Sequence, residues 1–546
     1  MHYSVKFSGT QGEGVDTVGE LMAAALHGQG YWTYGYRNFS SRIKGGYASF
    51  EVAFGNKPLR VKKEKQDVYV FIGPDGWETD ARDIQPGVMA LVDSSLKTTG
   101  VEGVLALPFL QVASSGVGAI FKWVVALGAL GAYLGLPQEA FNEPLALVFS
   151  RKGTELIAKN RAALEVGYKM APAPEQRGRF LLLQKSQQKE PSPLLLTRGS
   201  EVVAQAALAV GCNFISGYPI SPASDVFSYL ARSFTSGPGV AIQTEDEISA
   251  IDMAIGASYA GATAMVATSG PGLSLMIEGI GLSSATEVPL VVVNAQRVGP
   301  STGMPTKHEQ SDISLSLAGG HGDVLPMVFC PSSLEEIGID LPRAFYCAEK
   351  YRRPVIFLTD AAMMTARASV GELCYPHYDL AEMKETRAIP GAAGRMHHRS
   401  GNQLGARGLP TEVAAARREA FSERLKMWPE EMEDSFTMLS SGQEMLIVAI
   451  GSSRGAVEVA MEELEGRVSA IFPRVLAPLP AKALAQHFAQ YEKILVLDGN
   501  AQGQLLSLFK SHFACHDRLL SQKRYDGEPF TPSEIIAYVK EVLRHE

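Results

Sequence analysis

The sequence predicts an α/β protein made of three α/β domains. Short apolar runs of strand length recur along the chain and alternate with helix-like or turn segments. A chain of 546 residues has room for three to four domains of about 150 residues each. Changes in the pattern place the three domains at residues 1–183, 197–375 and 441–546. A polar, proline-containing linker over residues 184–196 and an irregular connecting segment over residues 376–440 separate them.

The first domain is predicted to open as half of a βαβ unit. Residues 3–7 form a strand, residues 9–14 a glycine-rich turn and residues 15–28 a helix. The glycines are ordered Gly-x-x-Gly-x-Gly, unlike the Gly-x-Gly-x-x-Gly of dinucleotide-binding turns. They predict a tight turn that lets helix and strand pack closely, and the alternative is an anion site at the helix N-terminus. Further strands are expected at residues 47–54, 68–72 and 88–93.

One apolar segment of the first domain reaches the length of a membrane span. Residues 116–135 are twenty nearly all-apolar residues. Lys122 lies inside this run, glycine is frequent in it, and its flanks show no anchoring pattern. These features favour a buried core helix, and we expect no membrane association.

The second domain is predicted to contain a parallel sheet covered on both faces, because its strands are continuous apolar runs. These strands are expected at residues 214–216, 264–268, 290–294, 324–329 and 355–358. Helices are expected at residues 199–211 and 223–232, and a charged helix at residues 411–427 of the connecting segment. The third domain is expected to form strands at residues 445–450, 468–472 and 494–497 and a helix at residues 455–464.

Composition limits the compartment and the partners. A net charge of −8 and a pI of about 5.9 argue against nucleic acid as a partner. The N-terminus lacks the basic and apolar regions of a signal peptide. The five cysteines are far apart and include no Cys-x-x-Cys pair, which fits a reducing cytoplasm and places any iron–sulfur centre on another chain.

Four polar segments, punctuated by glycine or proline or rich in acidic residues, follow or close the apolar runs of the second domain. They are residues 217–222, 245–247, 268–272 and 294–312. In an open α/β sheet, ligands bind at the carboxyl ends of the strands. The sequence therefore predicts that these four segments form one site at one edge of the sheet.

These segments, with one later segment, also carry motifs in a distinctive order. The motifs are Gly-Tyr-Pro-Ile-Ser-Pro from Gly217, Glu-Asp-Glu from Glu245, Thr-Ser-Gly-Pro-Gly from Thr268, Arg-Val-Gly-Pro-Ser-Thr-Gly-Met-Pro-Thr-Lys from Arg297, and Asp-Gly-Asn-Ala-Gln-Gly-Gln from Asp498. The ordered set resembles the α subunit of 2-oxoacid:ferredoxin oxidoreductases, most specifically the 2-oxoglutarate type. Residues 9–14 and Ile43-Lys-Gly-Gly46 resemble signatures of this family's γ domain, which can be fused ahead of the α subunit. The resemblance implies a γ domain, a thiamine-diphosphate pyrimidine-binding domain and a C-terminal transketolase-C-like domain.

The resemblance implies thiamine diphosphate as a cofactor. Its aminopyrimidine must exchange a proton at ring nitrogen N1′, and a buried Glu can supply this general acid/base. The resemblance gives this catalytic role to Glu247 in preference to Glu245, whereas acidic residues here can also simply complement the dipole of a helix N-terminus. The resemblance implies cofactor contacts from Tyr218, Pro219, Ile220, Ser269 and Gly270.

A 2-oxoacid substrate brings a carboxylate and a keto oxygen, so its site needs a fixed cation and a hydroxyl donor. The resemblance implies Arg297 for the carboxylate and Ser221, at a position that is more often Thr in the family, for the hydroxyl. A second cation, Lys307, fits a dicarboxylate such as 2-oxoglutarate better than pyruvate. The alternative for Lys307 is a solvated loop lysine.

Other polar residues carry weaker predictions. Asn500 and Gln504 belong to the last motif, and capping of the helix that begins nearby is an equal alternative for them. His397 and His398 lie among arginines and predict a solvated loop, so we expect no metal ligands in this chain.

The motif Gly-Asp-Gly with a later Asn, which holds Mg²⁺ and the diphosphate in thiamine enzymes, does not occur in the sequence. The resemblance therefore implies a partner β subunit that carries the diphosphate site, Mg²⁺ and a [4Fe–4S] cluster, in an (αβ)₂ assembly. It implies decarboxylation of a 2-oxoacid, electron exchange with ferredoxin, and acyl transfer to coenzyme A, which the γ domain helps to bind. Two alternatives stay open: the same chemistry on pyruvate or a branched 2-oxoacid, and a non-catalytic coenzyme-A-binding scaffold.

Overall fold

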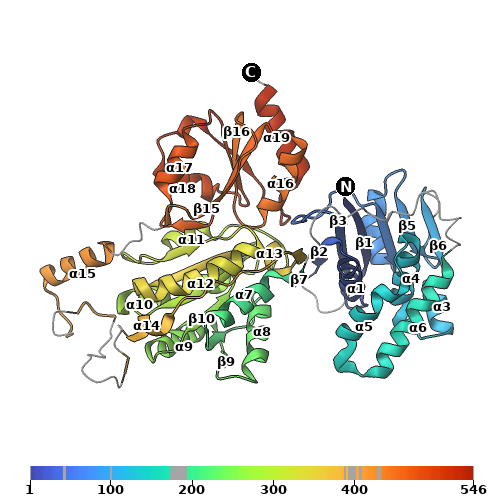
Figure 1. Ribbon diagram of the computed structural model, residues 1–546, viewed down its shortest axis with the longest axis horizontal. Helices are drawn as coiled ribbons and strands as arrows, with labels where there is room; N and C mark the ends of the chain where they lie inside the picture. Colours follow the sequence, from blue (N-terminus) through green and yellow to red (C-terminus); the bar gives the residue numbers. More distant parts are fainter. Residues whose placement is uncertain are drawn as a thin grey trace. The chain divides into compact units, whose positions relative to one another are not determined.

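The computed structural model describes residues 2–40, 45–98, 101–171, 194–385, 389–390, 401–404, 409–426 and 432–544. These residues divide into two compact units. The first comprises Met1–Thr197 with Ala366–Glu372, and the second comprises Arg198–Thr365 with Leu373–Glu546. Both units combine sheets with helices (Figure 1), which confirms the predicted α/β class. Most of the expected linker, and His397 with His398, lie outside the described residues.

The first unit contains an eight-stranded mixed sheet in the order β6-β5-β4-β1-β3-β2-β14-β7. Its strands are β1 (His2–Thr10), β2 (Trp32–Phe39), β3 (Tyr47–Gly55), β4 (Val68–Ile72), β5 (Met89–Asp93), β6 (Val104–Leu107), β7 (Leu195–Arg198) and β14 (Arg367–Val370). Strands β1, β4, β5 and β6 run parallel, whereas β3, β2 and β14 pair antiparallel. The sequence patterns missed β2, β6 and β7, and β7 begins at Leu195, inside the range expected to be a linker. They also included β14 in the range of the second domain, although Arg367 of β14 pairs with Gly35 of β2.

Helices of the first unit pack on both faces of the sheet, and most of them bury one face of each central strand in a large core. They are α1 (Val15–Gly28), α2 (Pro74–Asp80), α3 (Phe109–Ser115), α4 (Lys122–Leu134), α5 (Asn142–Phe149) and α6 (Thr154–Met170), with 3₁₀ turns at Ala81–Asp83, Ala119–Phe121, Gln138–Phe141 and Ser150–Lys152. Val68 and Val70 of β4 face this core, whereas Tyr69 and Phe71 form a small cluster with Trp77 of α2 on the opposite face. This alternation follows from the two-residue period of a strand.

Helix α4 is the buried core helix that residues 116–135 predict. It is 13 residues long, and each residue from Trp123 to Leu134 is buried. Within the part of the chain that the structure describes, no helix has both the length and the apolar character that a membrane crossing needs.

The glycine-rich turn at residues 9–14 lets β1, α1 and α4 pack closely. A Cβ added to Gly9 would lie 2.5 Å from Trp123 Cζ2 of α4 and 2.9 Å from the carbonyl oxygen of Ile72. Gly14 has φ +112°, a conformation that favours glycine. The predicted tight turn is therefore confirmed, and its glycines have a packing explanation.

The second unit contains a seven-stranded sheet in the order β18-β12-β13-β11-β10-β8-β9. Its strands are β8 (Phe214–Gly217), β9 (Val240–Gln243), β10 (Ala264–Thr268), β11 (Leu290–Gln296), β12 (Met327–Phe329), β13 (Pro354–Asp360) and β18 (Val475–Ala477). All neighbours pair in parallel except β12 and β18, as the apolar runs predict. The strand expected at residues 324–329 begins only at Met327.

The helices around this sheet include α9 and α10, which pack side by side, and α7, which packs against α8 and α12. The helices are α7 (Gly199–Ala209), α8 (Ser224–Phe234), α9 (Glu247–Tyr259), α10 (Gly270–Thr286), α11 (Ile313–Ala318), α12 (Leu334–Tyr351), α13 (Ala361–Thr365), α14 (Leu380–Glu385) and α15 (Ala414–Lys426). Helices α14 and α15 lie in the segment predicted to be irregular, and α15 is the expected charged helix.

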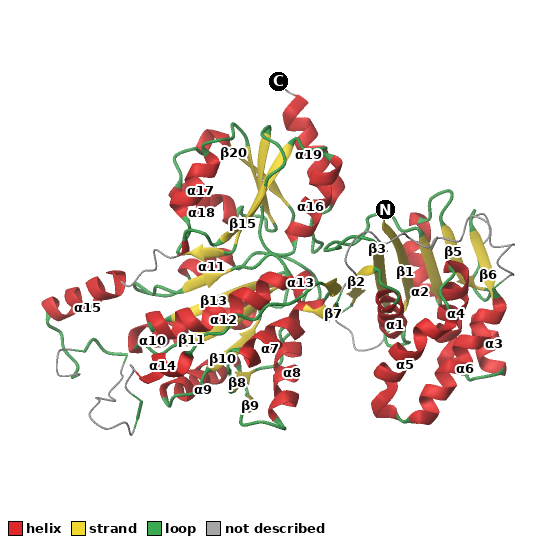
Figure 2. Ribbon diagram, in the orientation of Figure 1, coloured by secondary structure: helices red, strands yellow, loops and turns green. Residues whose placement is uncertain are grey.

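A second sheet of the same unit has five strands in the order β15-β17-β16-β19-β20. Its strands are β15 (Phe436–Leu439), β16 (Met445–Val448), β17 (Val468–Pro473), β19 (Ile494–Asp498) and β20 (Leu519–Lys523). Its helices are α16 (Ser453–Glu463), α17 (Ala481–Phe488), α18 (Gln504–His512) and α19 (Pro532–Arg544), with a 3₁₀ turn at His516–Arg518. Helices α17 and α18 lie on one side of this sheet and α16 and α19 on the other (Figure 2).

The two sheets of the second unit are joined by a strand, a shared core and ion pairs. Strand β18 follows β17 in the chain but pairs with β12 of the larger sheet. One hydrophobic cluster contains residues of both sheets, for example Val292 and Val448. Arg474 Nε donates to Asp340 Oδ2 at 2.8 Å, and Asp340 is fully buried. The C-terminal sheet is therefore fixed beside the sheet that carries the predicted site.

Candidate functional site

The predicted site segments lie at one edge of the larger sheet. Strands β9, β8, β10 and β11 are neighbours and run parallel, so their carboxyl ends meet at the same edge. The segments that follow them begin at Tyr218, Thr244, Ser269 and Arg297. The structure thus brings together, at one edge, four segments that span about a hundred residues of sequence.

Glu247 is the buried member of the Glu-Asp-Glu motif. Its side chain is 7% exposed, whereas Glu245 is exposed. Asp246 caps α9, because its Oδ1 accepts a hydrogen bond from the Ser249 backbone N–H at 2.7 Å, which also holds the pKa of Asp246 below its usual range. The structure therefore separates one buried acid from a capping acid and an exposed acid.

The Glu247 carboxyl group lies against the first turn of α10. A Cβ added to Gly272 would lie 2.8 Å from Glu247 Cγ, 2.9 Å from Glu247 Oε1 and 2.1 Å from Thr268 Oγ1. Within the described parts of the chain, the Glu247 carboxyl group has no hydrogen-bond donor as a partner. Neither Glu247 oxygen is among the fully buried polar atoms that lack a partner, so the carboxyl group of this mostly buried side chain keeps contact with solvent and stays open to a ligand.

Asp312 supplies a second carboxyl group that the sequence reasoning did not assign. A Cβ added to Gly270 would lie 2.7 Å from Asp312 Oδ2, so this group also lies at the start of α10. Asn294 Nδ2 donates to Asp312 Oδ2 at 2.9 Å. Burial raises the pKa of Asp312, and the Asn294 hydrogen bond and the Arg297 charge oppose this shift. The position of Asp312 at the end of the predicted site segment 294–312 was the available signal.

Arg297 joins two of the site segments. It directly follows β11, is 7% exposed, and donates from Nη1 to the backbone carbonyl of Ser221 at 2.8 Å. Its Nε is buried and has no acceptor among the residues that the structure describes. Burial lowers the pKa of Arg297, and the carboxylates of Asp312 and Glu247 oppose this shift. The guanidinium therefore has one N–H group for which the described residues provide no acceptor.

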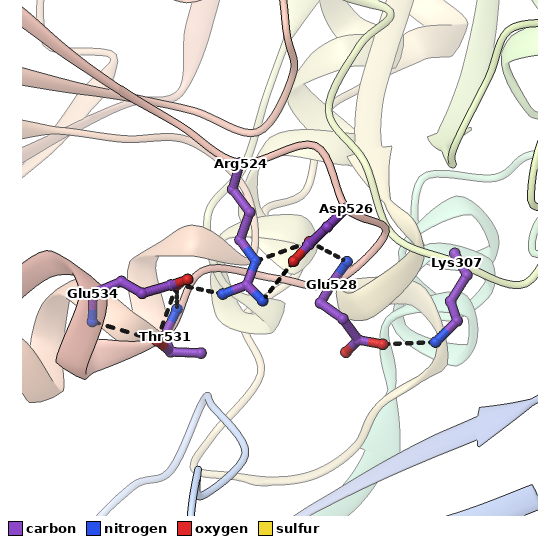
Figure 3. Close-up of polar contacts among 6 residues, drawn as sticks. All are labelled: Lys307, Arg524, Asp526, Glu528, Thr531 and Glu534. Atoms are coloured by element: carbon purple, nitrogen blue, oxygen red, sulfur yellow. Dashed lines mark hydrogen bonds and ion pairs between the residues drawn. The ribbon is translucent and has the colours of Figure 1, made fainter.

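Lys307 is brought back beside Arg297 by the fold of the loop. Val298 N donates to the Lys307 carbonyl at 3.2 Å, and Val298 pairs with Met304 in an isolated bridge. Lys307 Nζ lies 2.6 Å from Glu528 Oε1 (Figure 3). Lys307 is therefore ion-paired with the segment between β20 and α19, and its side chain is 26% exposed.

The predicted cofactor contacts differ in what their side chains can do. Tyr218 is 42% exposed, and Pro219 and Ser221 are also exposed. Ser269 is fully buried, and its hydroxyl donates to the Ala295 carbonyl at 2.7 Å. The hydroxyl of Ser269 is thus used within the sheet, and Ser269 with Gly270 would present backbone groups to a cofactor.

The C-terminal sheet clamps the site loop through polar side chains. Asn500 Oδ1 accepts hydrogen bonds from the N–H groups of Gly503 and Gln504 at 2.9 and 3.2 Å, and its Nδ2 donates to the Gln310 carbonyl at 3.0 Å. Gln504 Nε2 donates to the Ser311 carbonyl at 2.8 Å. Asn500 therefore both caps α18, as the alternative proposed, and holds the loop that carries Arg297 and Lys307.

No group of three or more His, Cys, Asp or Glu side chains that could hold a metal ion occurs among residues 2–544 outside the gaps given above.

Comparison with known proteins identifies the family. The family model described as pyruvate flavodoxin/ferredoxin oxidoreductase, thiamine diP-bdg, matches residues 205–432, and the model described as pyruvate ferredoxin/flavodoxin oxidoreductase matches residues 4–170. The 2-oxoglutarate synthase subunit KorA of Archaeoglobus fulgidus is 36% identical over 350 residues, which are 63% of this chain and 98% of that protein. The chain belongs to the 2-oxoacid:ferredoxin oxidoreductase family.

Two further members of the 2-oxoacid:ferredoxin oxidoreductase family match the chain over its whole length. The 2-oxoacid:ferredoxin oxidoreductase subunit alpha of Sulfolobus sp. is 25% identical over 100% of this chain and 97% of that protein. A solved structure of the 2-oxoglutarate:ferredoxin oxidoreductase from Magnetococcus marinus, with 2-oxoglutarate, coenzyme A and succinyl-CoA bound, is 30% identical, covers 99% of both chains and has a TM-score of 0.89. The chain is thus an oxidoreductase of this family with a thiamine-diphosphate-binding domain, and its fold extends over the full length of a solved relative.

The residues at the sheet edge fit the pyrimidine end of thiamine diphosphate. The carboxyl group of Glu247, which has no hydrogen-bond donor among the described residues, suits an aminopyrimidine ring nitrogen. Exposed Tyr218 and Ile220, which is half-buried, leave side-chain surface for the ring. Glu247, Tyr218 and Ile220 are therefore the residues that would hold it.

Proposed function

We propose that this chain is the α-type subunit of a thiamine-diphosphate-dependent 2-oxoglutarate:ferredoxin oxidoreductase of the cytoplasm. The reaction interconverts 2-oxoglutarate plus coenzyme A with succinyl-CoA, CO₂ and a proton, and the two electrons pass to or from ferredoxin. Family membership supports the reaction class. The observation that carries the proposal is Glu247, which is 7% exposed, lies at the edge of the sheet where the site segments meet, and has no hydrogen-bond donor among the described residues.

Glu247 acts as the general acid/base. It holds and exchanges a proton at N1′ of the aminopyrimidine from a position with 7% exposure, where water competes little for its oxygens. Gly272 permits this position because no side chain stands between the turn of α10 and the carboxyl group. When bound, thiamine diphosphate supplies the nucleophilic carbon and the electron sink for decarboxylation.

Arg297 and Ser221 orient the 2-oxoacid. The Nε of Arg297 donates to the substrate α-carboxylate while Nη1 stays on the Ser221 carbonyl, which fixes the plane of the guanidinium. The exposed Ser221 hydroxyl donates to the keto oxygen. Lys307, whose backbone lies beside Val298, binds the distal carboxylate of 2-oxoglutarate.

A β subunit completes the site with the diphosphate-binding residues, Mg²⁺ and a [4Fe–4S] cluster, in an (αβ)₂ assembly. Large apolar side chains near the site support an adjacent partner, because they are between 42% and 51% exposed although they belong to a folded α/β unit. They are Tyr218, Ile248, Met253, Leu275 and Met304. Coenzyme A is proposed to bind with help from the first unit, whose match to a separate family model supports its distinct role.

The test uses the chain co-purified with its partner subunit. The assay is coenzyme-A-dependent reduction of a viologen dye with 2-oxoglutarate. Glu247→Gln keeps the size of the side chain but removes its acid/base function, so turnover should fall at least about tenfold and up to about 10⁴-fold. Glu245→Gln is the matched control, because Glu245 is exposed beside the same helix end, and it should leave turnover unchanged. Unchanged turnover in Glu247→Gln would favour the non-catalytic scaffold.

One observation favours a second substrate class. The charge of Lys307 is already matched by Glu528 at 2.6 Å, as a site for a monocarboxylate would require. Pyruvate or a branched 2-oxoacid is therefore the alternative substrate. Activity with 2-oxoglutarate alone in a panel of the three acids supports the first proposal, and activity with pyruvate or the branched acid alone replaces it.

A further inference from the structure

A segment of the C-terminal sheet, residues 524–531 between β20 and α19, packs on the loop that carries Lys307. The backbone N–H of His308 donates to the Gly527 carbonyl at 3.0 Å. Gly527 has φ +86°, and a Cβ added there would lie 3.0 Å from Met304 Cε and 3.1 Å from Lys307 Cβ. This close approach brings the next residue, Glu528, to Lys307.

Residues 524–531 are braced so that Glu528 is held in place (Figure 3). Arg524 donates from Nε and Nη2 to the two oxygens of Asp526, each at 3.0 Å, and also pairs with Glu534. Asp526 Oδ1 in turn accepts from the Glu528 backbone N–H at 3.0 Å. Because the backbone on either side of Glu528 is fixed, its carboxylate meets Lys307 without a large entropic cost.

The carboxylate of Glu528 contacts Lys307, the cation that the proposed function assigns to the distal carboxylate of the substrate. Lys307 Nζ and Glu528 Oε1 are 2.6 Å apart, and the two side chains are 26% and 23% exposed. A lysine ammonium has three donors, so it can contact a second carboxylate. The negative charge of Glu528, however, cancels part of the attraction that Lys307 offers to that carboxylate.

We propose that Glu528 is a specificity-determining residue that competes with the distal carboxylate of the substrate for Lys307. The inference rests on the proposed function, because it takes Lys307 as the site of that carboxylate. Glu528 lowers the affinity of the enzyme for a dicarboxylate 2-oxoacid and leaves its affinity for a monocarboxylate nearly unchanged. It acts through Lys307 and takes no part in the chemistry.

The experiment compares Glu528→Gln with the wild-type complex in the viologen assay, with 2-oxoglutarate and pyruvate as separate substrates. Glu528→Gln keeps the shape of the side chain and removes its charge. KM for 2-oxoglutarate should fall about two- to fivefold, the range of a partly exposed ion pair, with kcat unchanged, and the kinetic constants for pyruvate should not move. The double variant Lys307→Ala/Glu528→Gln should show the same KM as Lys307→Ala.

Glu444→Gln is the matched control. Glu444 lies in the same C-terminal part of the chain, pairs with Arg467 at 2.6 Å on the surface, and loses the same charge without touching residues 524–531. It should leave all constants unchanged.

The outcomes separate the two proposals. If wild-type turns over 2-oxoglutarate but Glu528→Gln leaves KM unchanged, raises it, or shifts the constants for both substrates equally, the role of Glu528 is wrong and the proposed function stands. If the wild-type complex turns over no 2-oxoacid, the proposed function is wrong and this inference falls with it.

Discussion

A substitution at Gly272 tests whether the close packing of the first turn of α10 against the Glu247 carboxyl group matters for activity. We consider Gly272→Ala, which adds one methyl group at a place where it would lie 2.8 Å from Glu247 Cγ and 2.1 Å from Thr268 Oγ1. Contacts below 3.0 Å force the neighbours to move. The Glu247 carboxyl group and the Thr268 hydroxyl must therefore shift.

The expected magnitudes separate stability from activity. Overpacking a core costs about 1–3 kcal/mol, and Ala in place of Gly inside a helix returns about 0.5–1 kcal/mol. The net loss, about 2.5 kcal/mol or less, is small against the roughly 5–15 kcal/mol by which proteins are stable. A displacement of about 1 Å at a catalytic group, by contrast, can cost about 10²-fold in rate.

The assay measures turnover in the viologen assay and the free energy of unfolding by urea denaturation. Gly272→Ala should lose about 10²-fold in turnover while it stays folded. Gly256→Ala in α9 is the matched control, because an added Cβ meets nothing within 4 Å there. It should keep full turnover and gain about 0.5–1 kcal/mol.

A double variant tests whether the loss of turnover comes from displacement of Glu247 or of Thr268. Thr268→Ala combined with Gly272→Ala removes the hydroxyl that the new methyl group would meet first, at 2.1 Å. If the displaced Glu247 is the cause, the double variant stays impaired. Full turnover in Gly272→Ala alone would refute the reasoning, and so would a loss of turnover that unfolding accounts for.

Two further predictions concern Asn500 and Asp498 of the C-terminal sheet region, beside the start of α18. Asn500→Ala removes the cap of α18 and the hydrogen bond to the Gln310 carbonyl, so urea denaturation should show a loss of about 1–2 kcal/mol. Asn500→Asp keeps the capping oxygen but has no N–H to donate to the Gln310 carbonyl from its buried position, so it should also lose stability, whereas unchanged stability in Asn500→Ala would contradict both contacts. Burial raises the pKa of Asp498 to about 6, well above its usual value of about 3.9. The folded protein binds the Asp498 proton more tightly than the unfolded chain does. Proton binding therefore stabilises the fold fully below about pH 4, and this contribution, at most about 3 kcal/mol, is lost as the pH rises through about 6. The free energy of unfolding, measured between about pH 4 and 7, should fall less with rising pH for Asp498→Asn than for the wild-type protein. The same pH dependence in both proteins would disprove the assignment.

The sequence by itself determined the secondary structure that forms the scaffold of the site. Uninterrupted apolar runs such as residues 290–294 have the pattern of strands buried on both faces, and the structure has β11 at Leu290–Gln296. Polar residues directly after such runs mark the carboxyl ends of strands, which places Arg297 and the residues near Glu247 at a sheet edge. The 116–135 run likewise contains too many glycines, and one lysine, for a membrane span, and α4 lies buried in the core.

Sequence patterns were weaker where strands are short or partly exposed. Strand β6 has no fully buried residue, and β2 is polar toward its end, so neither shows a clear apolar run. Strand β14 is four residues long and pairs with a partner more than three hundred residues away in the chain. Such pairings depend on which edge is left open in the folded sheet, and local composition carries no signal of that.

The tertiary structure alone decided which charges meet at the site. Within the motif Glu-Asp-Glu, the backbone of α9 and the turn of α10 determine that Glu247 is buried and Asp246 caps the helix. Lys307 meets Glu528 across a sequence separation of 221 residues, because β20 and α19 place residues 524–531 against the site loop. The reason is physical: side-chain periodicity records whether a residue is buried, whereas the partner of a charged group depends on which distant segments the packed sheets bring together.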